Sequence, residues 1–400
     1  MRDAVIVEAV RTPVAKGKPG GAYAEIHPVD LHAHALRSLL ERVSGLEPAE
    51  IDDVIGGTVG QVGEQSSNNT RFAALAAGFG ESVPGVTVDR QCGSSQQAIS
   101  FAAQGVVAGA YDIVIASGVE SMSRVPIGSA AVVDGVRADI GGPAIAGRFG
   151  GLIPQGVSAE LIARKWGLTR TQLDEFAATS HQRAAAAWRD GHFATQIAPL
   201  KTAELAHDET IRPQTSVETL AGLRPAFAAD GWTGRFGEID WKVTAGNSSP
   251  LNDGSAALLL TTSDIARERG WRPRARIHTA TVVGDDPVYM LTGIIPATAK
   301  VLARAGLSLA DIDAFEVNEA FSSVVLAWLA ETGADPSRVN VDGGAIAIGH
   351  PLGASGARLA TTLLGVLERT GGRYGLQTMC EAGGTANATI IERLDGSSGS

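Results

Sequence analysis

Cysteine and long apolar runs are scarce in this sequence of 400 residues. The two cysteines, Cys92 and Cys380, are too few for a disulfide framework. No apolar run approaches the roughly 18 residues that a membrane-spanning helix needs, and the start, MRDAVIVEAVRTP, lacks the apolar core of a signal peptide. These absences argue against a secreted disulfide scaffold and a membrane protein. We therefore expect a cytoplasmic location and no membrane partner.

Basic residues are also fewer than acidic ones. The chain has 33 Lys and Arg against 43 Asp and Glu, which gives a formal net charge of −10 at pH 7. A negative surface disfavours general binding to nucleic acid or to acidic lipid, so we expect no nucleic-acid partner. An anionic ligand would have to meet a local basic patch.

Signals for metals and nicotinamide cofactors are weak. His32 and His34 lie two residues apart in an expected helix, so they point to different faces and cannot share a metal. The prediction for both is ordinary helix surface. The Gly-rich segments do not form a G-x-G-x-x-G dinucleotide loop. We expect no metal and no permanently bound cofactor.

Strand and helix patterns alternate along the chain. Apolar residues make up 44% of it, which is enough for a substantial core. Residues 4–10 form a β-prone run, residues 30–43 show helical spacing of apolar side chains, and residues 54–55 and 113–116 are typical of buried strands. This alternation predicts an α/β fold with a mainly parallel sheet.

Three short patterns occur twice, in the same order. The copies are GLEPAEID at residues 45–52 and GLSLADID at 306–313, VTVD at 86–89 and VNVD at 339–342, and a tyrosine that begins a strand at residues 111 and 374. The spacing of about 250 to 265 residues predicts a duplicated domain rather than a repeat array. Residues 121–246 have no counterpart and carry much of the charge. We predict that they form an insertion over the substrate, with a helix that starts at a capping box of Thr169 and Gln172.

Cys92 occupies a position that suits a nucleophile. A short strand at residues 86–88 gives way to a helix with apolar residues through position 107, so the turn falls on residues 92–95. At a helix start the unpaired N–H groups favour a thiolate over a thiol. The alternative is that Cys92 is one more small buried residue.

Two later Gly-rich turns each hold one reactive side chain. His350 lies in GGAIAIGHPLGASG, residues 343–356, and Cys380 begins CEAGG, residues 380–384. The chain has 49 glycines, well above the usual share of about 7%, and the excess gathers in such turns. His350 precedes Pro351, which places it on a loop and suits a general base. Cys380 suits an acid/base at a substrate carbon, with a buried residue or a disulfide to Cys92 as alternatives.

Together these motifs resemble those of the thiolases, acyl-CoA acyltransferases that make or cleave 3-ketoacyl-CoA. The chain contains VDRQCGSSQQA around Cys92, NEAF at residues 318–321, the complete histidine box and CEAGG, in the order found in that family. The degradative actinobacterial branch is the most similar. The resemblance implies a five-layered αβαβα thiolase fold with two duplicated halves, residues 1–267 and 271–394, and an inserted loop domain at 121–246. It also implies a homotetramer or homodimer.

The resemblance gives each candidate residue a role. Cys92 would carry the acyl group, His350 would activate it, and Cys380 would exchange a proton with the α-carbon. One oxyanion hole would consist of the N–H groups of Cys92 and Ala382, and the other of His350 with a water held by Asn318.

The resemblance also implies that coenzyme A and acetyl-CoA act as substrates. Ser249 matches the serine that contacts the pantetheine arm, and Arg212 matches the arginine at the nucleotide end.

Two departures from the family pattern matter. Ala382 stands where thiolases usually have glycine, and alanine tolerates a positive φ poorly. Pro154 and Gln155 replace the histidine and methionine of the acetoacetyl-specific enzymes. We therefore expect a longer or bulkier 3-ketoacyl substrate, such as a steroid-derived one.

Two alternatives to a thiolase remain at this stage. A ketoacyl synthase has a related fold, but Cys380 argues against it because decarboxylative condensation needs no base at the α-carbon. A non-catalytic acyl-CoA or lipid carrier would retain the fold without turnover. The final residues, 395–400, resemble a flexible linker or tag remnant and are left out of the fold prediction.

Overall fold

A computed structural model of the protein describes residues 2–394, so the predicted flexible tail at 395–400 lies outside the described residues. The strands are β1 (Val5–Arg11), β2 (Ala15–Lys16), β3 (Asp53–Gly57), β4 (Val86–Val88), β5 (Ile113–Ser121), β6 (Val132–Val133), β7 (Val136–Arg137), β8 (Asn252–Thr261), β9 (Ala275–Gly284), β10 (Ala314–Val317), β11 (Tyr374–Glu381) and β12 (Thr385–Arg393). The helices are α1 (Pro28–Leu40), α2 (Asn69–Ala76), α3 (Ser94–Ala108), α4 (Gly142–Phe149), α5 (Gln155–Lys165), α6 (Arg170–Arg189), α7 (Val217–Ala221), α8 (Thr233–Phe236), α9 (Ser263–Glu268), α10 (Ile294–Ala305), α11 (Ser322–Thr332), α12 (Ala345–Ile348) and α13 (Ser355–Thr370).

The main sheet has two halves with the same strand order. The first half runs β4-β3-β5-β8-β1, and the second runs β10-β11-β12-β9. In each half a parallel pair, β3 with β5 or β10 with β11, is followed by two antiparallel pairs, and β4 adds a further parallel pair at the edge of the first half. The prediction of a mainly parallel sheet is therefore wrong, because β8, β9 and β12 run antiparallel to their neighbours. The halves join where β1 meets β9. A parallel bridge between Phe315 and Val339 occupies the place that β4 takes beside β3 in the first half.

The predicted repeat also appears in its hydrogen bonds. The carboxylate of Asp52 accepts the two backbone N–H groups where β5 begins, at 2.6 and 2.9 Å. Its copy, Asp313, accepts the two equivalent N–H groups at the start of β11, also at 2.6 and 2.9 Å. The duplicated α/β fold predicted from sequence is therefore confirmed.

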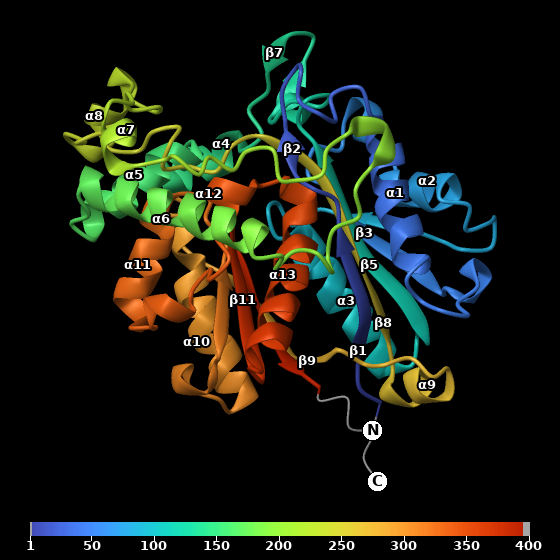
Figure 1. Cartoon of the computed structure of the whole chain (residues 1–400). Helices are drawn as coiled ribbons and strands as arrows, with labels where there is room; N and C mark the ends of the chain where they lie inside the picture. Colours follow the sequence, from blue (N-terminus) through green and yellow to red (C-terminus); the bar gives the residue numbers. More distant parts are fainter. Residues whose placement is uncertain (1, 395–400) are drawn as a thin grey trace.

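Helices and sheet halves alternate in five layers (Figure 1). α1 and α2 cover the outer face of the first half, and α10 and α11 cover the outer face of the second. α3 and α13 pack against each other between the halves. Apolar side chains fill the space on both faces of each half, and their burial supplies the main driving force for folding.

The two central helices approach closely at their N-terminal ends. A Cβ atom on Gly356 would lie 2.2 Å from the backbone nitrogen of Gln96, so only glycine allows this approach. The Ser95 hydroxyl then accepts the N–H of Ala357 at 2.9 Å. This contact brings the start of α3 and the histidine box together across more than half of the sequence.

The prediction for His32 was wrong. Its side chain is fully buried: Nε2 lies 2.8 Å from Oγ of Ser117, and Nδ1 lies 3.2 Å from Oδ1 of Asn69. The reason is that α1 packs against both the sheet and α2, so two of its faces are covered. His34 is half-buried and contacts the carbonyl of Ala198 at 3.1 Å.

The predicted insertion contains α4 to α8 and the β6–β7 hairpin, and it lies over one end of the layered body (Figure 1). α6 begins directly after Thr169, whose hydroxyl accepts the N–H of Gln172 in the predicted capping box. Between residues 2 and 394, no helix has the length and apolar character to cross a membrane.

Candidate active site

Cys92 lies in a constrained turn between β4 and α3. Gln91, directly before it, has a φ of +48°, in the left-handed region that side-chain-bearing residues rarely adopt. The N–H of Gln91 donates to Asp89 at 2.7 Å, and the N–H of Arg90 donates to the Ser94 hydroxyl at 2.9 Å. α3 begins at Ser94, so the turn ends slightly earlier than predicted. The turn holds Cys92 at the start of the helix with its thiol buried.

The thiol form of Cys92 is favoured, contrary to prediction. Burial raises the pKa of the Cys92 thiol well above its usual value, and the nearby charges of Cys380 and Glu381 raise it further. The prediction that the helix start would favour a thiolate is therefore wrong, because desolvation outweighs the field of the N–H groups. A nucleophilic Cys92 needs a base that removes its proton during the attack.

His350 can serve as that base because its tautomer is fixed. Its Nδ1 lies 2.6 Å from the Ser355 hydroxyl, and that hydroxyl donates its only proton to the carbonyl of Pro351 at 2.9 Å. With its proton on Pro351, the hydroxyl accepts from Nδ1–H, and the lone pair of Nε2 faces the amide nitrogen of Asn318. The backbone N–H of His350 donates to Asn252 at 2.8 Å and fixes the turn.

The imidazole of His350 is neutral at physiological pH. Burial lowers its pKa to about 3, with a further contribution from the positive charge of Arg358. Nε2 lies 3.4 Å from the Nδ2 of Asn318, so the two predicted oxyanion-hole side chains face each other. The Oδ1 of Asn318 is buried and finds no partner among the described residues. That oxygen is oriented to hold a polar ligand or a water.

Hydrogen bonds of Glu319 fix the loop that carries Asn318. The carboxylate of Glu319 accepts from Ser180 at 2.6 Å, from Asn340 at 2.8 Å and from the N–H of Ile346 at 3.1 Å. These bonds link the NEAF loop to α6 and to the turn before His350. Glu319 thus provides the structural support that the sequence suggested.

Cys380 lies near the end of β11, opposite Ala386 of β12. Burial raises the pKa of its thiol to about 12, and the charge of Glu381 adds to this. Met379, its neighbour, packs with Cys92 in one small cluster, together with Leu352 of the histidine box. The two cysteines are free thiols, and the predicted alternative of a disulfide between them is not found.

Ala382 is half-buried and does not adopt a positive φ. The two residues after it, Gly383 and Gly384, do so instead, with φ values of +85° and +79°. The alanine at this position therefore introduces no backbone strain, and its N–H remains as a donor. The concern raised by the departure from the family pattern does not apply to the backbone.

The two predicted coenzyme A contacts differ in burial and in the segments to which they are bonded. Ser249 is half-buried, and its N–H donates to the carbonyl of Ala320 in the NEAF loop at 3.0 Å. Arg212 is exposed on the inserted segment, and its guanidinium finds no acceptor in residues 2–394. Ser249 is thus bonded to the loop that carries Asn318, whereas Arg212 is bonded through its backbone to α6.

Sequence reasoning missed two residues of the site. Ser355 fixes the tautomer of His350, and it belongs to the GASG of the same histidine box. Glu381 is fully buried beside the Cys92 turn: a Cβ on Gly93 would lie 2.0 Å from its Oε1. Burial raises the pKa of this carboxyl to about 7, while Arg90 and a bond from Thr385 act in the opposite direction.

Comparison with known families matches this geometry. The thiolase N-terminal domain family matches residues 4–264, and the thiolase C-terminal domain family matches residues 271–393. The chain belongs to the thiolase family. The predicted fold and enzyme class, a thiolase-type acyltransferase, are therefore confirmed.

Individual thiolases are similar over nearly the whole length. The steroid 3-ketoacyl-CoA thiolase FadA6 of Mycobacterium tuberculosis is 50% identical, over 98% of this chain and 95% of its own. A 3-ketoacyl-CoA thiolase of Erwinia tasmaniensis is 44% identical, over 98% of this chain and all of its own. The crystal structure of the Bacillus anthracis acetyl-CoA acetyltransferase superposes with a TM-score of 0.86 at 37% identity, covering 98% of this chain and 99% of that one.

Proposed function

We propose that this thiolase cleaves 3-ketoacyl-CoA by thiolysis through an acyl-Cys92 intermediate, and can run the same steps in reverse as a Claisen condensation. The observation that carries the proposal is a neutral, buried His350 whose Nε2 faces Asn318, on a Gly-rich box that also contributes Leu352 to the cluster around the free thiol of Cys92. A neutral imidazole can take a proton, and because its pKa is low the transfer from Cys92 accompanies the attack on substrate and does not precede it.

In the first half-reaction, Nε2 of His350 takes the thiol proton as Sγ of Cys92 attacks the 3-keto carbon. The bond between carbons 2 and 3 then breaks, and carbon 2 takes a proton from the Cys380 thiol as acetyl-CoA leaves. Negative charge on the attacked oxygen meets the N–H groups of Cys92 and Ala382, and charge on the acetyl thioester oxygen meets His350 and a water on Asn318. Each such donor is worth about 3 kcal/mol in comparable sites.

In the second half-reaction, the thiolate of Cys380 takes the proton of the coenzyme A thiol, whose sulfur attacks the acyl-Cys92 thioester. The bond between Sγ of Cys92 and the acyl carbon breaks, the shortened acyl-CoA leaves, and the proton on Nε2 of His350 returns to Cys92. The thioester intermediate keeps the acyl group activated between the two halves. Both steps use groups of the protein, a water and coenzyme A, so no permanently bound cofactor is required.

We further propose that the chain has two thiolase halves, residues 1–267 and 271–394, and that coenzyme A lies along the loop domain inserted in the first half, residues 121–246. Ser249 would contact the pantetheine arm, because its backbone is bonded to the NEAF loop. Arg212 would contact the nucleotide end, because it is an exposed arginine outside the site. A cytoplasmic location is proposed as well, supported by the two free thiols, and cell fractionation tests it.

The acyl group is proposed to be larger than acetoacetyl, with a steroid-derived chain as the leading candidate. The support is the replacement of the family's histidine and methionine by Pro154 and Gln155, at the start of α5, and the 50% identity to a protein named as a steroid thiolase. Thiolysis of a panel of 3-ketoacyl-CoA substrates tests this. A preference for acetoacetyl-CoA over every longer substrate would refute it.

A homodimer or homotetramer is proposed on the basis of two exposed apolar surfaces. β4 is an edge strand, and Phe72, Leu75 and Val86 are exposed beside it. The β6–β7 hairpin exposes Val133 and Val136. Edge strands and apolar patches of this kind are commonly covered by a second chain. Sedimentation as a monomer at micromolar concentration would contradict the proposal.

Intact-protein mass spectrometry tests the catalytic assignment. After incubation with substrate, wild type should gain the mass of the acyl group and Cys92→Ser should not. Cys380→Ser should still be acylated but should fail to exchange the carbon–carbon bond. Acyl transfer at the wild-type rate in Cys92→Ser would overturn the assignment, and binding without any acylation of wild type would favour a carrier.

A further inference from the structure

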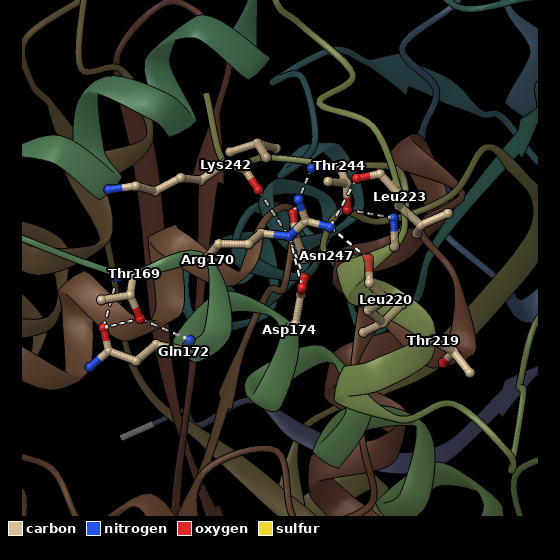
Figure 2. Close-up of polar contacts among 12 residues, drawn as sticks. Thr169, Arg170, Gln172, Asp174, Thr219, Leu220, Leu223, Lys242, Thr244 and Asn247 are labelled. Carbon is tan, nitrogen blue, oxygen red and sulfur yellow. Dashed lines mark hydrogen bonds and ion pairs between the residues drawn. The ribbon is translucent and has the colours of Figure 1, made fainter. Parts of the chain in front are cut away.

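One helix, α6, holds both ends of the segment that carries Arg212. The N–H of Arg212 donates to Nδ1 of His181 on α6 at 3.2 Å. Eight to eleven residues later, the carbonyls of Leu220 and Leu223 accept from Nη2 of Arg170, at 2.6 and 3.1 Å (Figure 2). Arg170 is the first residue of α6, so hydrogen bonds attach both ends of residues 212–223 to this helix.

Arg170 is connected in turn to a buried carboxylate. Its Nε donates to Oδ2 of Asp174 at 2.7 Å, and Oδ1 of Asp174 accepts from Nδ2 of Asn247 at 2.8 Å (Figure 2). Asp174 is only 1% exposed, and both of its oxygens are used. A buried carboxylate needs both donors, because loss of Arg170 leaves its charge uncompensated and loss of Asn247 leaves one oxygen without a hydrogen bond.

Asn247 connects Asp174 to the loop of Asn318 through hydrogen bonds. Its Oδ1 accepts the N–H of Thr244 at 2.8 Å, and its backbone carbonyl accepts the N–H of Ser322 at 3.0 Å. Two residues on, Ser249 bonds to Ala320. The side chain of Asn247 therefore fixes a turn whose backbone is hydrogen-bonded to the NEAF loop on both sides of Phe321.

We propose that Arg170, Asp174 and Asn247 are positioning residues. They hold the Arg212 segment, the Ser249 turn and the Asn318 loop in the relative positions that binding of coenzyme A requires. This inference rests on the proposed function. Within the chain of contacts the roles differ: Arg170 fixes the outer, nucleotide end, and Asn247 fixes the inner, pantetheine end. None of the three needs to touch the reacting atoms.

Comparison of two acyl acceptors tests the role of Arg170. Coenzyme A carries the nucleotide and pantetheine lacks it, so a displaced Arg212 segment affects only the first. In Arg170→Met, the KM for coenzyme A should rise about tenfold with kcat within about twofold, while the KM for pantetheine stays unchanged. Arg170 is partly exposed but is the charged partner of the buried Asp174, so Arg170→Met is made together with Asp174→Asn, whose Oδ1 can still accept from Asn247, and is compared with Asp174→Asn alone.

Arg164→Met is the matched control. Arg164 is an arginine of the same inserted domain, and it also donates to two backbone carbonyls, those of Phe236 and Glu238. It does not contact the Arg212 segment or Asn247, so both KM values should remain at wild type. Equal changes for coenzyme A and pantetheine in Arg170→Met, or the same change in Arg164→Met, would overturn the inference.

Asn247→Ala tests the inner end. Loss of its amide should lower kcat/KM by about tenfold or more for both acceptors, since the Ser249 turn and the Asn318 loop move for each. If this buried variant does not fold, the Arg170 comparison decides alone. Failure of the proposed function would look different, because wild type itself would then neither be acylated at Cys92 nor use either acceptor.

Discussion

The Oγ atom of Ser355 lies 2.6 Å from Nδ1 of His350 and donates its proton elsewhere, to Pro351. One hydroxyl therefore selects the tautomer of the imidazole. The base is prepared before any substrate arrives, because the accepting lone pair already lies on Nε2, beside Asn318.

Removal of that hydroxyl should impair the base while leaving the nucleophile in place. In Ser355→Ala, kcat for thiolysis should fall by about 10- to 100-fold, because the imidazole can rotate or adopt the other tautomer. Stopped-flow measurement of Cys92 acylation checks this. Thr361→Ala is a suitable control, since Thr361 also bonds to a carbonyl within α13 but is not bonded to His350. Acylation at the wild-type rate in Ser355→Ala would exclude the tautomer argument.

The carboxyl of Glu381 should make the reactivity of Cys92 depend on pH near neutrality. Its pKa is raised to about 7 by burial, and its negative charge raises the pKa of Cys92. As pH rises past 7, Glu381 therefore becomes charged and opposes thiolate formation. In Glu381→Gln, alkylation of Cys92 by iodoacetamide at pH 8 should be about three- to tenfold faster, without an inflection near pH 7.

The exposed residue Glu81 provides the control for this measurement. Glu81→Gln removes the same charge from a residue that does not contribute to the raised pKa of Cys92, so it should leave the alkylation profile unchanged. An unchanged profile in Glu381→Gln as well would mean that its charge does not reach Cys92.

Substitution of Ala382 by the glycine usual in thiolases should have little effect. The backbone at Ala382 is not in the left-handed region, so glycine relieves no strain there and only adds freedom to the unfolded chain. We expect a loss of about 0.5 to 1 kcal/mol in the free energy of unfolding and a kcat/KM within about threefold of wild type. A tenfold gain in kcat/KM would show instead that the methyl group crowds the oxyanion hole.

Burial of His32 should cost stability in acid. Desolvation lowers the pKa of His32 to about 4 in the folded state, whereas an unfolded histidine titrates near 6.5. Between these values the unfolded chain binds more protons, so this stability is complete above pH 6.5 and is lost as pH falls toward 4. The loss is about 3 kcal/mol for this one site. Urea unfolding at pH 7.5 and 5 should show a smaller difference in His32→Gln than in wild type.

Local patterns predicted much of the site because its chemistry sits in short motifs. The Gly-rich turn around His350, the capping box at Thr169 and the repeated Asp52 and Asp313 segments are encoded by residues close in sequence, and each was found where it was expected. The resemblance to thiolases then assigned roles to residues that no periodicity could identify, Asn318 and Ser249 among them.

Predictions failed where a side chain's surroundings come from distant parts of the chain. His32 has the sequence context of a surface helix, but α2 and Ser117 of β5 enclose it. The pKa of Cys92 follows from burial and from Glu381, a residue nearly 290 positions away, and not from its own helix start. Desolvation depends on total packing, which local sequence does not contain.

The sequence by itself determined the family and the duplicated α/β layout, and it supplied the candidates for the reacting side chains, because these depend on residue identity and on local spacing. Only the tertiary structure decided the protonation states and the links between segments: the neutral His350 with its lone pair on Nε2, and the contacts from Arg170 through Asp174 to Asn247. Both result from burial and from hydrogen bonds between segments that meet only after folding.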